Sequence, residues 1–327
     1  TLAACASSPS SAASTSCERT DSDASVLDFA QASGDFGKPA VTLKAPVYVD
    51  STTYTDTEVG TGPQITSDAP DAVFSIAIAN GATGQSLVQA APPVQPLSSW
   101  NSSYQGLVTA MMCATEGTRV VAAIPASELS AAGAQDLGVT DDQSIAVTID
   151  ITKVYLAAAD GTPQYNDRRG MPSVVLAPGG RPGVIVPDAA APTELAVEVL
   201  KKGDGETIGQ GDTARVQYTG VNWSTRKVTD STWENGASVA VAPGSKLAFA
   251  PQLVGATVGS QLLVVVPAGD SATAGDAATV YVVDVLGIDS RRIHLTVFAV
   301  GTALALTAGV LAAPLYSVYP NMGDGFL

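Results

Sequence analysis

The chain has 327 residues, of which 46% are hydrophobic and 14% charged, so we expect two or three folded domains rather than a disordered chain. It carries 31 acidic against 16 basic residues, a formal charge of −15, which repels phosphate backbones and excludes nucleic acid as an expected partner. A single histidine and the absence of a Cys-x-x-Cys pair argue against a metal site, and we predict no metal and no cofactor.

The first residues contain a pattern typical of bacterial lipoprotein processing. Leu2-Ala3-Ala4-Cys5 has the apolar-small-small-Cys order of such a site, which would make Cys5 the lipidated residue. Residues 6–16 are almost wholly Ser, Ala and Thr, the composition of a flexible tether. We therefore assign residues 1–34 to a lipobox-like start and a tether. The alternative is an Ala-rich segment that carries no lipid.

Two cysteines remain if Cys5 is lipidated. Cys17 and Cys113 are an even number, which suits one disulfide in an oxidising compartment. This bond would hold the N-terminal segment against the first domain. The sequence leaves open the alternative of a buried free thiol at Cys113 and an incidental Cys17.

Two parts of the chain repeat each other. Residues 111–125 (MMCATEGTRVVAAIP) align with residues 253–267 (LVGATVGSQLLVVVP) at a constant offset of 142 residues. Residues 149–151 then align with residues 283–285 at an offset of 134, so the first copy has a longer loop after its proline. A repeat of this length indicates duplicated domains, because solenoid units have only about 20–50 residues.

Both copies contain short runs of β-branched residues bounded by Gly, Pro, Asn and Asp, which predict antiparallel strands. In the second copy these runs are Thr213–Tyr218, Gln261–Val266 and Val280–Leu286, and Phe249–Val254 is a short helical candidate. The expected fold class is therefore α+β, mostly β, with a short helix across a sheet face.

The segment between the copies is small, polar and punctuated by proline, which is the composition of a domain boundary. We place the junction near residues 156–170. The first domain is then expected over residues 35–156 and the second over residues 170–289.

The second copy resembles the FKBP-type peptidyl-prolyl isomerases. Tyr218-Thr219-Gly220 is followed by a turn at residues 222–225 and by Asp230-Ser231, a Tyr and an Asp placed as in that family. Residues 253–267 are similar to its short helix, turn and next strand, and residues 281–286 to its closing strand. The resemblance implies two tandem FKBP-like domains, each an antiparallel sheet wrapped on a short helix.

The resemblance covers residues 193–288 and implies a pocket for a proline ring. Tyr218 and Tyr281 would supply ring faces, and Phe249 takes the place of the tryptophan floor that the family usually has. Asp230 would accept a hydrogen bond near the substrate carbonyl or orient the Tyr218 hydroxyl. In the simpler alternative the tyrosines pack within their strands and Asp230 is a turn residue.

Several positions depart from the family pattern and imply weak or absent activity. Val239 would be a lesser wall of the pocket, and Thr229 replaces the aromatic residue usually found beside the aspartate. Ser245-Lys246 stands where an aliphatic pair usually presents its backbone, so Lys246 becomes a candidate substrate contact. The loop at residues 268–278 lacks the tyrosine that the family commonly uses as a carbonyl donor.

The first copy has lost the implied site. Ile76 stands at the Tyr218 position, Gln85-Ser86-Leu87-Val88 contains no carboxylate, and Val147 replaces Tyr281. We expect this domain to be non-catalytic and retained for binding, spacing or stability.

The last part of the chain differs from the rest. Residues 293–315 contain no Asp, Glu, Lys or Arg and follow Arg291-Arg292. Such a run can cross a hydrocarbon core of about 30 Å, so we assign residues 291–318 to a transmembrane helix and residues 319–327 to a tail. The alternative is a signal-peptide-like pattern. The arginine pair favours a cytoplasmic start of this helix, whereas the lipoprotein interpretation places residues 6–290 outside.

Two functions follow from the sequence. The first is a proline isomerase or foldase, tethered to the outer face of the bacterial cytoplasmic membrane, that acts on proline-containing peptides or envelope proteins. The second is a non-catalytic accessory subunit of an integral membrane complex, which Thr229, Ser245-Lys246 and the degraded first copy favour. Gly301, Ala305 and Gly309 recur every four positions, a spacing that permits close helix contact or simply reflects ordinary Ala/Gly content. A Ser-His-Asp hydrolase is not supported, since the lone His294 lies at the edge of the predicted membrane segment.

Overall fold

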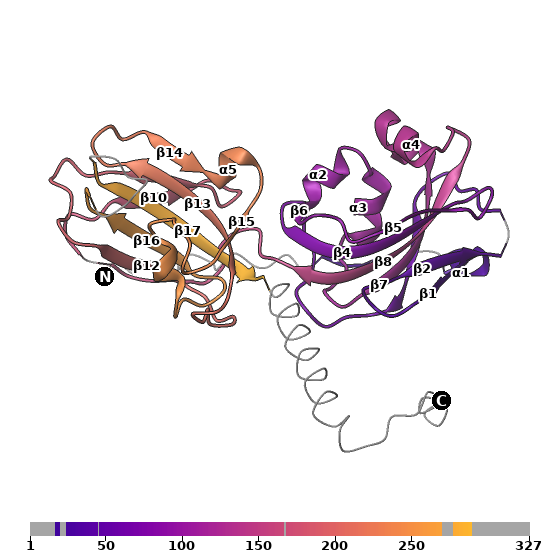
Figure 1. Ribbon diagram of the computed structural model, residues 1–327, viewed down its shortest axis with the longest axis horizontal. Coiled ribbons are helices and arrows are strands. Elements are labelled where there is room, and N and C mark those ends of the chain that lie inside the picture. Colours follow the sequence, from indigo (N-terminus) through magenta and orange to yellow (C-terminus); the bar gives the residue numbers. More distant parts are fainter. Residues whose placement is uncertain (1–16, 20–23, 45, 167, 270–276, 290–327) are drawn as a thin grey trace, which may run out of the picture. The chain divides into compact units, whose positions relative to one another are not determined.

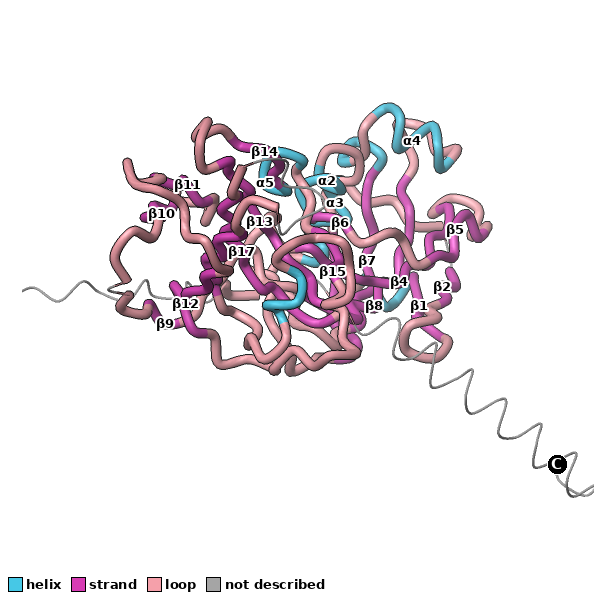
Figure 2. Tube along the Cα trace, turned by 60° about the vertical axis from the view of Figure 1, so that its left-hand side comes forward, coloured by secondary structure: helices cyan, strands magenta, loops and turns pink. Residues whose placement is uncertain are grey.

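A computed structural model describes residues 17–19, 24–44, 46–166, 168–269 and 277–289 (Figure 1). These residues form two compact units, unit 1 mainly from residues before Ala159 and unit 2 mainly from residues after Ala158. Strands and loops make up most of both units, with a few short helices (Figure 2). The expectation of a mostly β chain with little helix is therefore confirmed.

The main sheet of unit 1 is antiparallel, in the order β3-β7-β8-β4-β5, and β6 pairs with β4. Its strands are β3 (Thr53–Glu58), β4 (Asp71–Asn80), β5 (Ser86–Ala90), β6 (Gln95–Pro96), β7 (Arg119–Pro125) and β8 (Ser144–Val154). Both faces of β7 are buried, because Val120 and Ala122 belong to one apolar cluster while Val121 and Ala123 belong to others. Alternate residues of a strand face opposite sides, so each face of this sheet needs a cover.

Short helices cover one face of the unit 1 sheet. They are α2 (Leu97–Asn101), α3 (Gln105–Met111), the 3₁₀ turn η1 (Ala126–Glu128) and α4 (Ala131–Leu137). Leu107 and Met111 of α3 are buried in the same cluster as alternate residues of β7 and β8. The Ser130 hydroxyl caps α4 by accepting a bond from Gly133 N at 3.0 Å, and Gly138 ends it with a left-handed φ of 64°.

A hairpin covers the opposite face of that sheet. It consists of α1 (Val26–Phe29), β1 (Ala30–Ser33) and β2 (Ala40–Leu43), and β1 pairs with β2. Val26 and Ala30 are buried against Ala123 and Val121 of β7. Residues 24–34 thus belong to unit 1, whereas the sequence suggested a tether, because the second apolar face of the sheet gives them a packing surface.

Unit 2 repeats this design around an antiparallel sheet ordered β14-β13-β17-β16-β12-β9, with β15 paired to β13. The strands are β9 (Thr162–Pro163), β12 (Ala196–Lys202), β13 (Ala214–Asn222), β14 (Val228–Ser231), β15 (Val239–Val241), β16 (Gln261–Val266) and β17 (Thr279–Ile288), and α5 (Thr232–Asn235) follows β14 in the chain. The small, polar segment predicted as a boundary supplies β9, so part of it joins the unit 2 sheet.

The two faces of the unit 2 sheet are also covered. The expected helix at Phe249–Val254 is a single 3₁₀ turn, η2 (Ala250–Leu253), whose N-cap is Phe249. Pro251 stands in the first turn, where no N–H is needed, and the segment ends where Val254 becomes extended and Gly255 takes a left-handed φ of 84°. The hairpin of β10 (Ser173–Leu176) and β11 (Pro182–Ile185) packs its Val174 and Val184 against the other face.

Equivalent hydrogen bonds occur within each unit, as the duplicated sequence would lead us to expect. Asn80 and Asn222, 142 residues apart, each turn the chain by accepting a main-chain bond from Thr83 N at 3.1 Å and Thr225 N at 2.9 Å respectively. A second pattern joins a glycine to two hydroxyl residues in each unit: Gly60 with Thr115 and Thr118, and Gly203 with Thr257 and Ser260. The duplication therefore extends to the polar contacts that fix the loops.

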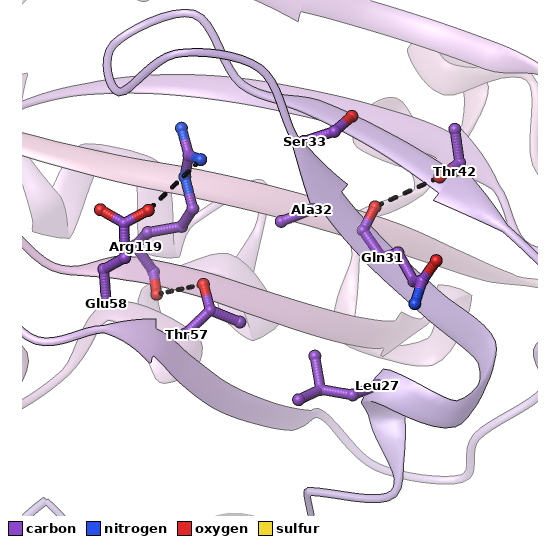
Figure 3. Close-up of a pocket in the computed structure, with 8 residues that line it drawn as sticks. All are labelled: Leu27, Gln31, Ala32, Ser33, Thr42, Thr57, Glu58 and Arg119. Atoms are coloured by element: carbon purple, nitrogen blue, oxygen red, sulfur yellow. Dashed lines mark hydrogen bonds and ion pairs between the residues drawn. The ribbon is translucent and has the colours of Figure 1, made fainter.

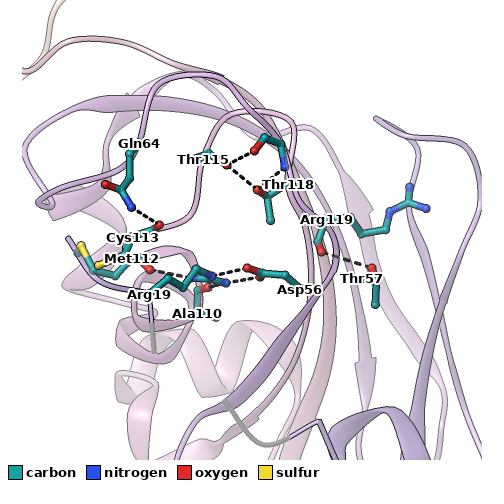
Figure 4. Close-up of polar contacts among 11 residues, drawn as sticks. Arg19, Asp56, Thr57, Gln64, Ala110, Met112, Cys113, Thr115, Thr118 and Arg119 are labelled. Carbon is teal, nitrogen blue, oxygen red and sulfur yellow. Dashed lines mark hydrogen bonds and ion pairs between the residues drawn. The ribbon is translucent and has the colours of Figure 1, made fainter. Parts of the chain in front are cut away.

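A disulfide between Cys17 and Cys113 fixes the N-terminal arm of unit 1, residues 17–19. Figure 4 shows Cys113 with Gln64, which donates to its main-chain carbonyl. Gln64 Nε2 donates to the main-chain carbonyls of both cysteines, each at 2.9 Å. The cysteine pair is thus bonded, and Cys113 is not a free thiol. Cys5 and the lipobox-like start lie outside the described residues.

The predicted fold class is wrong in one respect, because no transmembrane helix is found in the described part of the chain. Among the described residues no helix is long and apolar enough to cross a bilayer. The longest α-helices there, α3 and α4, have 7 residues each, about a third of the roughly 20 that a span requires. The segment assigned to the helix, residues 291–318, lies outside the described residues, together with His294 and the Gly301, Ala305 and Gly309 spacing.

Candidate active site

Tyr218 and Tyr281 lie on neighbouring strands of unit 2 and face the same side of the sheet. In the ladder between β13 and β17, Tyr218 is opposite Val283 and Tyr281 is opposite Gly220. The two tyrosines therefore stand diagonally across the ladder, within reach of each other. A Cβ at Gly220 would lie 3.0 Å from Tyr281 Cε1 and 2.9 Å from Thr229 Oγ1, so glycine leaves the room that the Tyr281 ring occupies.

Phe249 completes a group of three rings with these tyrosines, which we call the aromatic cluster. The ring centroids of Tyr218 and Phe249 are 5.0 Å apart, those of Phe249 and Tyr281 5.2 Å, and those of the two tyrosines 6.4 Å. All three pairs are tilted and lie in the range of favourable aromatic contacts. The residues are 5%, 0% and 6% exposed in the order Tyr218, Phe249, Tyr281, so the cluster is largely closed to water.

A carboxylate stands at the edge of the aromatic cluster. The Tyr218 hydroxyl donates a hydrogen bond to Asp230 Oδ2, and Asp230 lies exposed on the adjacent strand β14. Burial of the ring, followed by the bond to Asp230, raises the pKa of Tyr218 above that of an ordinary tyrosine. Tyr218 therefore stays protonated at neutral pH and acts as a hydrogen-bond donor.

The three residues expected to contact substrate differ in position. Val239 lies opposite Val216 in the ladder between β15 and β13 and packs, partly buried, against the same apolar core as the aromatic cluster. Thr229 is exposed on β14 and approaches Gly220 with its hydroxyl. Lys246 is exposed in the turn before η2 and has no contact that ties it to the rings.

The aromatic cluster has a hydroxyl and a carboxylate at one edge, and its ring faces are covered. A small apolar ring beside a polar peptide group would suit such a site once one of the three rings moved aside. Within the described residues no group of three or more His, Cys, Asp or Glu side chains is placed to hold a metal.

The corresponding region of unit 1 is aliphatic. Ile76 and Val147 occupy the positions of Tyr218 and Tyr281, and both are buried in the unit 1 core. Gln85 precedes β5, whose Leu87 and Val88 pack partly buried against that core. No hydroxyl or carboxylate takes the place of the pair between Tyr218 and Asp230 at these positions.

Unit 1 has a different pocket, of about 410 Å³, between the β1–β2 hairpin and the edge of the main sheet (Figure 3). Gln31, Ser33 and Thr42 line one side, and Glu58 and Arg119 line the other. Arg119 donates to the carbonyl of Gly34 at 2.9 Å and lies 3.6 Å from the Glu58 carboxylate. Because its guanidinium is already engaged, this pocket offers no free cation for an anionic ligand.

Sequence analysis missed two buried carboxylates that hold corresponding places in the units. Arg119 Nε and Nη2 donate to Asp150 at 2.6 Å and 2.9 Å, and Gln261 Nε2 donates to Asp284 at 2.7 Å. Each pair is directly opposed on neighbouring strands. The repeat offsets of 142 and 134 already aligned Arg119 with Gln261 and Asp150 with Asp284, so this signal was present in the sequence.

The two pairs differ in how their surroundings shift the pKa of an ionisable group, Arg119 in unit 1 and Asp284 in unit 2. The hydrogen bonds from Arg119 to Asp150 and the charge of that carboxylate raise the pKa of Arg119, against the opposing effect of burial. Burial raises the pKa of Asp284, and the bonds from Ala159 N and Gln261 and the charge of Lys201 only partly oppose it. An ion pair in unit 1 is thus replaced in unit 2 by a carboxyl bound to neutral donors.

Comparisons with known proteins point to one group. No family model matches the chain. A 56-residue stretch is 36% identical to an FK506-binding protein of Streptomyces anulatus and covers 17% of this chain and 45% of that protein. The chain thus spans less than half the length of this curated relative.

Solved structures of similar proteins overlap the chain loosely. The three FKBP domains of wheat FKBP73 cover 74% of this chain and 98% of theirs at 12% identity, with a TM-score of 0.33. A peptidyl-prolyl cis-trans isomerase of Pseudomonas syringae covers 33% and 77% at 21% identity and a TM-score of 0.28. FkpA of Escherichia coli covers 37% and 52% at 19% identity and a TM-score of 0.27. The sequence match to the Streptomyces protein is thus a likeness over one 56-residue stretch.

Proposed function

We propose that unit 2 is a peptidyl-prolyl cis-trans isomerase that acts on proline-containing segments of other proteins. The observation that supports this most is the hydrogen bond from Tyr218 to Asp230 at the edge of the aromatic cluster. The partial likeness to an FK506-binding protein supports the same class of site.

The proposed reaction needs no nucleophile, metal or redox group. Rotation about a peptide bond faces a barrier of about 18–20 kcal/mol because of amide resonance, and an X–Pro bond has cis and trans forms of similar energy. An enzyme has only to bind the twisted amide better than the planar one. The bond is rotated, and none is broken.

Each residue of the site has a role in this proposal. The faces of Tyr218, Phe249 and Tyr281 contact the proline ring and exclude water from the amide, which weakens its planar, polar form. Asp230 holds the Tyr218 hydroxyl in one orientation, so that the hydroxyl and the carboxylate face the rotating carbonyl. Val239 supports the rings from β15. Thr229 and Lys246 are small or mobile groups at the rim and add little apolar surface, so we expect a slow enzyme.

Unit 1 is proposed to be non-catalytic, because Ile76 and Val147 supply neither ring faces nor a donor at the matching positions. We also propose that the protein works outside the cytoplasm. The disulfide between Cys17 and Cys113 favours an oxidising compartment. A lipid on Cys5 would tether it to the outer face of the cytoplasmic membrane, where envelope proteins would be its clients.

A second function, that of a non-catalytic accessory protein, is favoured by one observation. The three rings expose at most 6% of their surface and fill the space between themselves, so a substrate ring has to displace one of them. If this displacement costs too much, unit 2 binds other proteins through its surface without catalysis. The proposed partner is then a membrane protein complex rather than a peptide.

A protease-coupled assay with a proline-containing peptide separates the two functions. We expect the full chain to accelerate isomerisation, and Tyr218→Phe to lower kcat/KM by about 10- to 150-fold, since a hydrogen bond to a charged group contributes about 1.5–3 kcal/mol. Asp230→Asn is expected to have a similar effect. Asp188→Asn, which changes a fully exposed carboxylate of unit 2, is the matched control and is expected to have no effect. A rate equal to that in buffer at high protein concentration would rule out catalysis.

A further inference from the structure

The N-terminal arm of unit 1, residues 17–19, is fastened by one covalent bond and one arginine. Its disulfide joins Cys17 to Cys113, 96 residues further along the chain. Two residues after Cys17, the Arg19 guanidinium donates to both carboxylate oxygens of Asp56 and to two main-chain carbonyls at the C-terminal end of α3 (Figure 4). Cys113 lies two residues after α3 ends, so both fastenings meet at the same place.

The place that holds the Arg19 side chain, which we call the socket, suits a guanidinium. The carbonyls of Ala110 and Met112 accept its bonds at 2.9 Å and 2.6 Å. The centroid of the Tyr54 ring lies 4.5 Å from the guanidinium carbon, close enough to attract the cation. The last carbonyls of a helix have no partner within the helix and carry its negative partial charge. A planar guanidinium can satisfy two of them and still pair with Asp56 through two parallel bonds.

The socket shields its ion pair from water. The side chains of Arg19 and Asp56 are 14% and 17% exposed, whereas pairs at an open surface contribute little. An empty socket would leave a largely buried carboxylate and two helix-end carbonyls without these donors. Removing one partner of such a pair is unfavourable, because the remaining charge is desolvated and unpaired. The empty socket would therefore favour another guanidinium.

The disulfide decides how firmly the arm keeps Arg19 in the socket. While the disulfide is closed, Arg19 is two residues from a covalent anchor, and its effective concentration at the socket is very high. Without the disulfide, the contacts of the arm in the described structure are those of Arg19 and a bond from Gln64 Nε2 to the Cys17 carbonyl at 2.9 Å. Opening the disulfide therefore lets another arginine compete for the socket.

Two observations indicate that this disulfide can be opened. Both cysteines are half-buried rather than enclosed in the core, so a thiol can approach them. Cys113 also has a left-handed backbone with a φ of 63°, which costs about 1–2 kcal/mol for a residue with a Cβ. The residue at the same place in unit 2, 142 positions on, is Gly255 with a φ of 84°. Exposed disulfides, and those at strained positions, are the labile ones.

We propose that the disulfide between Cys17 and Cys113 gates the socket, and that the open socket binds an arginine of a partner protein. In the oxidised state the arm fills the socket with its own Arg19. A dithiol reductant opens it: one thiolate attacks a sulfur of the disulfide, and the second then displaces the protein. The reductant leaves as a disulfide, and two electrons and two protons pass to the cysteines, which become thiols.

The occupant is a peptide segment rather than a small cation, because the socket also contacts the main chain of its present occupant. Gln64 Nε2 has two hydrogens, one for the carbonyl of Cys113 and one for the carbonyl of Cys17, two residues before the arginine. The formal charge of −15 favours a cationic segment over an acidic one. The socket shares no residue with the aromatic cluster, so this inference does not depend on the proposed isomerase.

A peptide titration tests the proposal on the full chain. The probe is a capped peptide with the sequence of residues 15–21 and Cys17→Ser, and its control also carries Arg19→Ala. The protein carries Cys5→Ser, which leaves two cysteines, and it is titrated oxidised and in dithiothreitol while the amide signals of β3 are followed by NMR. We expect saturable shifts with the arginine peptide in the reduced protein, at least tenfold weaker binding in the oxidised protein, and none with the alanine peptide.

Variants separate the socket from its gate. Cys17→Ser combined with Arg19→Ala removes both fastenings, so it is expected to bind the arginine peptide more tightly than the reduced protein does. Adding Asp56→Asn to that protein should weaken binding tenfold or more, because the carboxylate is lost. Asp141→Asn is the matched control at an exposed carboxylate of unit 1, and it should leave the affinity within about twofold, since surface charges are screened by salt.

The redox equilibrium supplies a readout that a merely structural arm would not give. Because the peptide and the closed arm exclude each other, saturating peptide should shift the equilibrium toward the thiols by the factor by which reduction tightens binding. The thiol fraction is measured by alkylation and mass spectrometry in buffers of reduced and oxidised dithiothreitol. Hydrogen exchange of β7 and β8 is expected to stay protected on reduction, which shows that unit 1 remains folded.

Four results would overturn the proposal. The first is equal affinity of the oxidised and reduced protein for the arginine peptide. The second is equal affinity of the arginine and alanine peptides, or no effect of Asp56→Asn. The third is loss of protection in β7 and β8 on reduction, because a gate requires a folded socket. The fourth is a dimer of the reduced protein that Arg19→Ala abolishes, which would identify the arm of a second copy as the occupant.

Discussion

Replacing the two buried carboxylates by asparagine is expected to destabilise unit 1 strongly and unit 2 little. Asp150 is fully buried and accepts three hydrogen bonds, two from Arg119 and one from Gly37 N at 2.7 Å. In Asp150→Asn the new amide group faces the Arg119 donors, and Arg119 keeps a buried charge without its partner. Breaking a buried pair in this way costs about 3–5 kcal/mol. Unit 1 is therefore expected to lose about that much stability.

In Asp284→Asn the new amide group faces the side-chain amide of Gln261, where Asp150 faces a guanidinium. Asp284 accepts from Gln261 Nε2 at 2.7 Å and from Ala159 N at 3.0 Å. The Gln261 amide can turn to present its oxygen to the new donor, which a guanidinium cannot do. The substituted amide is then satisfied on both sides, so we expect the stability of unit 2 to change by no more than about 1 kcal/mol at neutral pH.

The pH dependence supplies a second readout for Asp284. Because its pKa is raised in the folded state, its contribution to stability is fully present below the unfolded-state pKa of about 3.9 and is lost as the pH rises through the folded-state pKa. Unit 2 should therefore lose stability between acid and neutral pH. Asp284→Asn should remove that part of the slope.

Hydrogen exchange measured by mass spectrometry at increasing urea separates the units. Peptides from β7 and β8 report on unit 1, and peptides from β16 and β17 report on unit 2. Adding Arg119→Gln to Asp150→Asn gives unit 1 the pairing of unit 2 and should recover part of the loss. Equal losses in the two single variants, or no recovery in the double variant, would refute the reasoning.

Two further predictions concern stability. Cys17→Ser should lower the free energy of unfolding of unit 1 by about 2–5 kcal/mol, because the disulfide closes a long loop. Reductant should lower the urea midpoint of unit 1 in the unmodified chain by the same amount. A lower midpoint of unit 2 instead would contradict this prediction. Gly203→Ala should destabilise unit 2 by about 1–3 kcal/mol or more, because a Cβ there would lie 2.0 Å from Val258 O. Gly211→Ala is its control, since that Cβ would meet no atom within 4 Å, and equal melting temperatures would show the argument to be wrong.

Strands with a strong residue signal were predictable from the sequence. The run of β-branched residues at Gln261–Val266 coincides with β16, and Val280–Leu286 lies within β17. The helix at Phe249–Val254 was less predictable, since an apolar segment of six residues suits a helix or a turn. In the structure the extended backbone of Val254 ends it after one 3₁₀ turn.

The site was predictable only in part. The likeness to the FKBP pattern brought Tyr218 and Asp230 together as a hypothesis, and the structure places a hydrogen bond between them. The burial of the rings was not predictable, because it depends on the packing of Phe249 between two strands. Arg19 gave no signal at all, since two of its partners are main-chain carbonyls, which any residue carries.

The two cover hairpins escaped prediction for a physical reason. Each strand of these hairpins (β1, β2, β10 and β11) has only four residues. So short a strand shows too few apolar–polar alternations to be distinguished from a polar loop. What holds them is the second apolar face of each main sheet, to which Val121 in unit 1 and Leu263 in unit 2 contribute. Continuous apolar runs in both sheets indicated this second face, although not what covers it.

NMR exchange spectroscopy of a proline-containing peptide tests the central claim most directly, because it measures the interconversion of cis and trans without a protease. The uncatalysed exchange takes about 10–100 s at room temperature. The proposal predicts exchange peaks on a shorter timescale when a small amount of the full chain is added, and their loss with Tyr281→Ala, which removes one wall of the aromatic cluster. An unchanged exchange rate with the unmodified chain, or full activity in Tyr281→Ala, would contradict it.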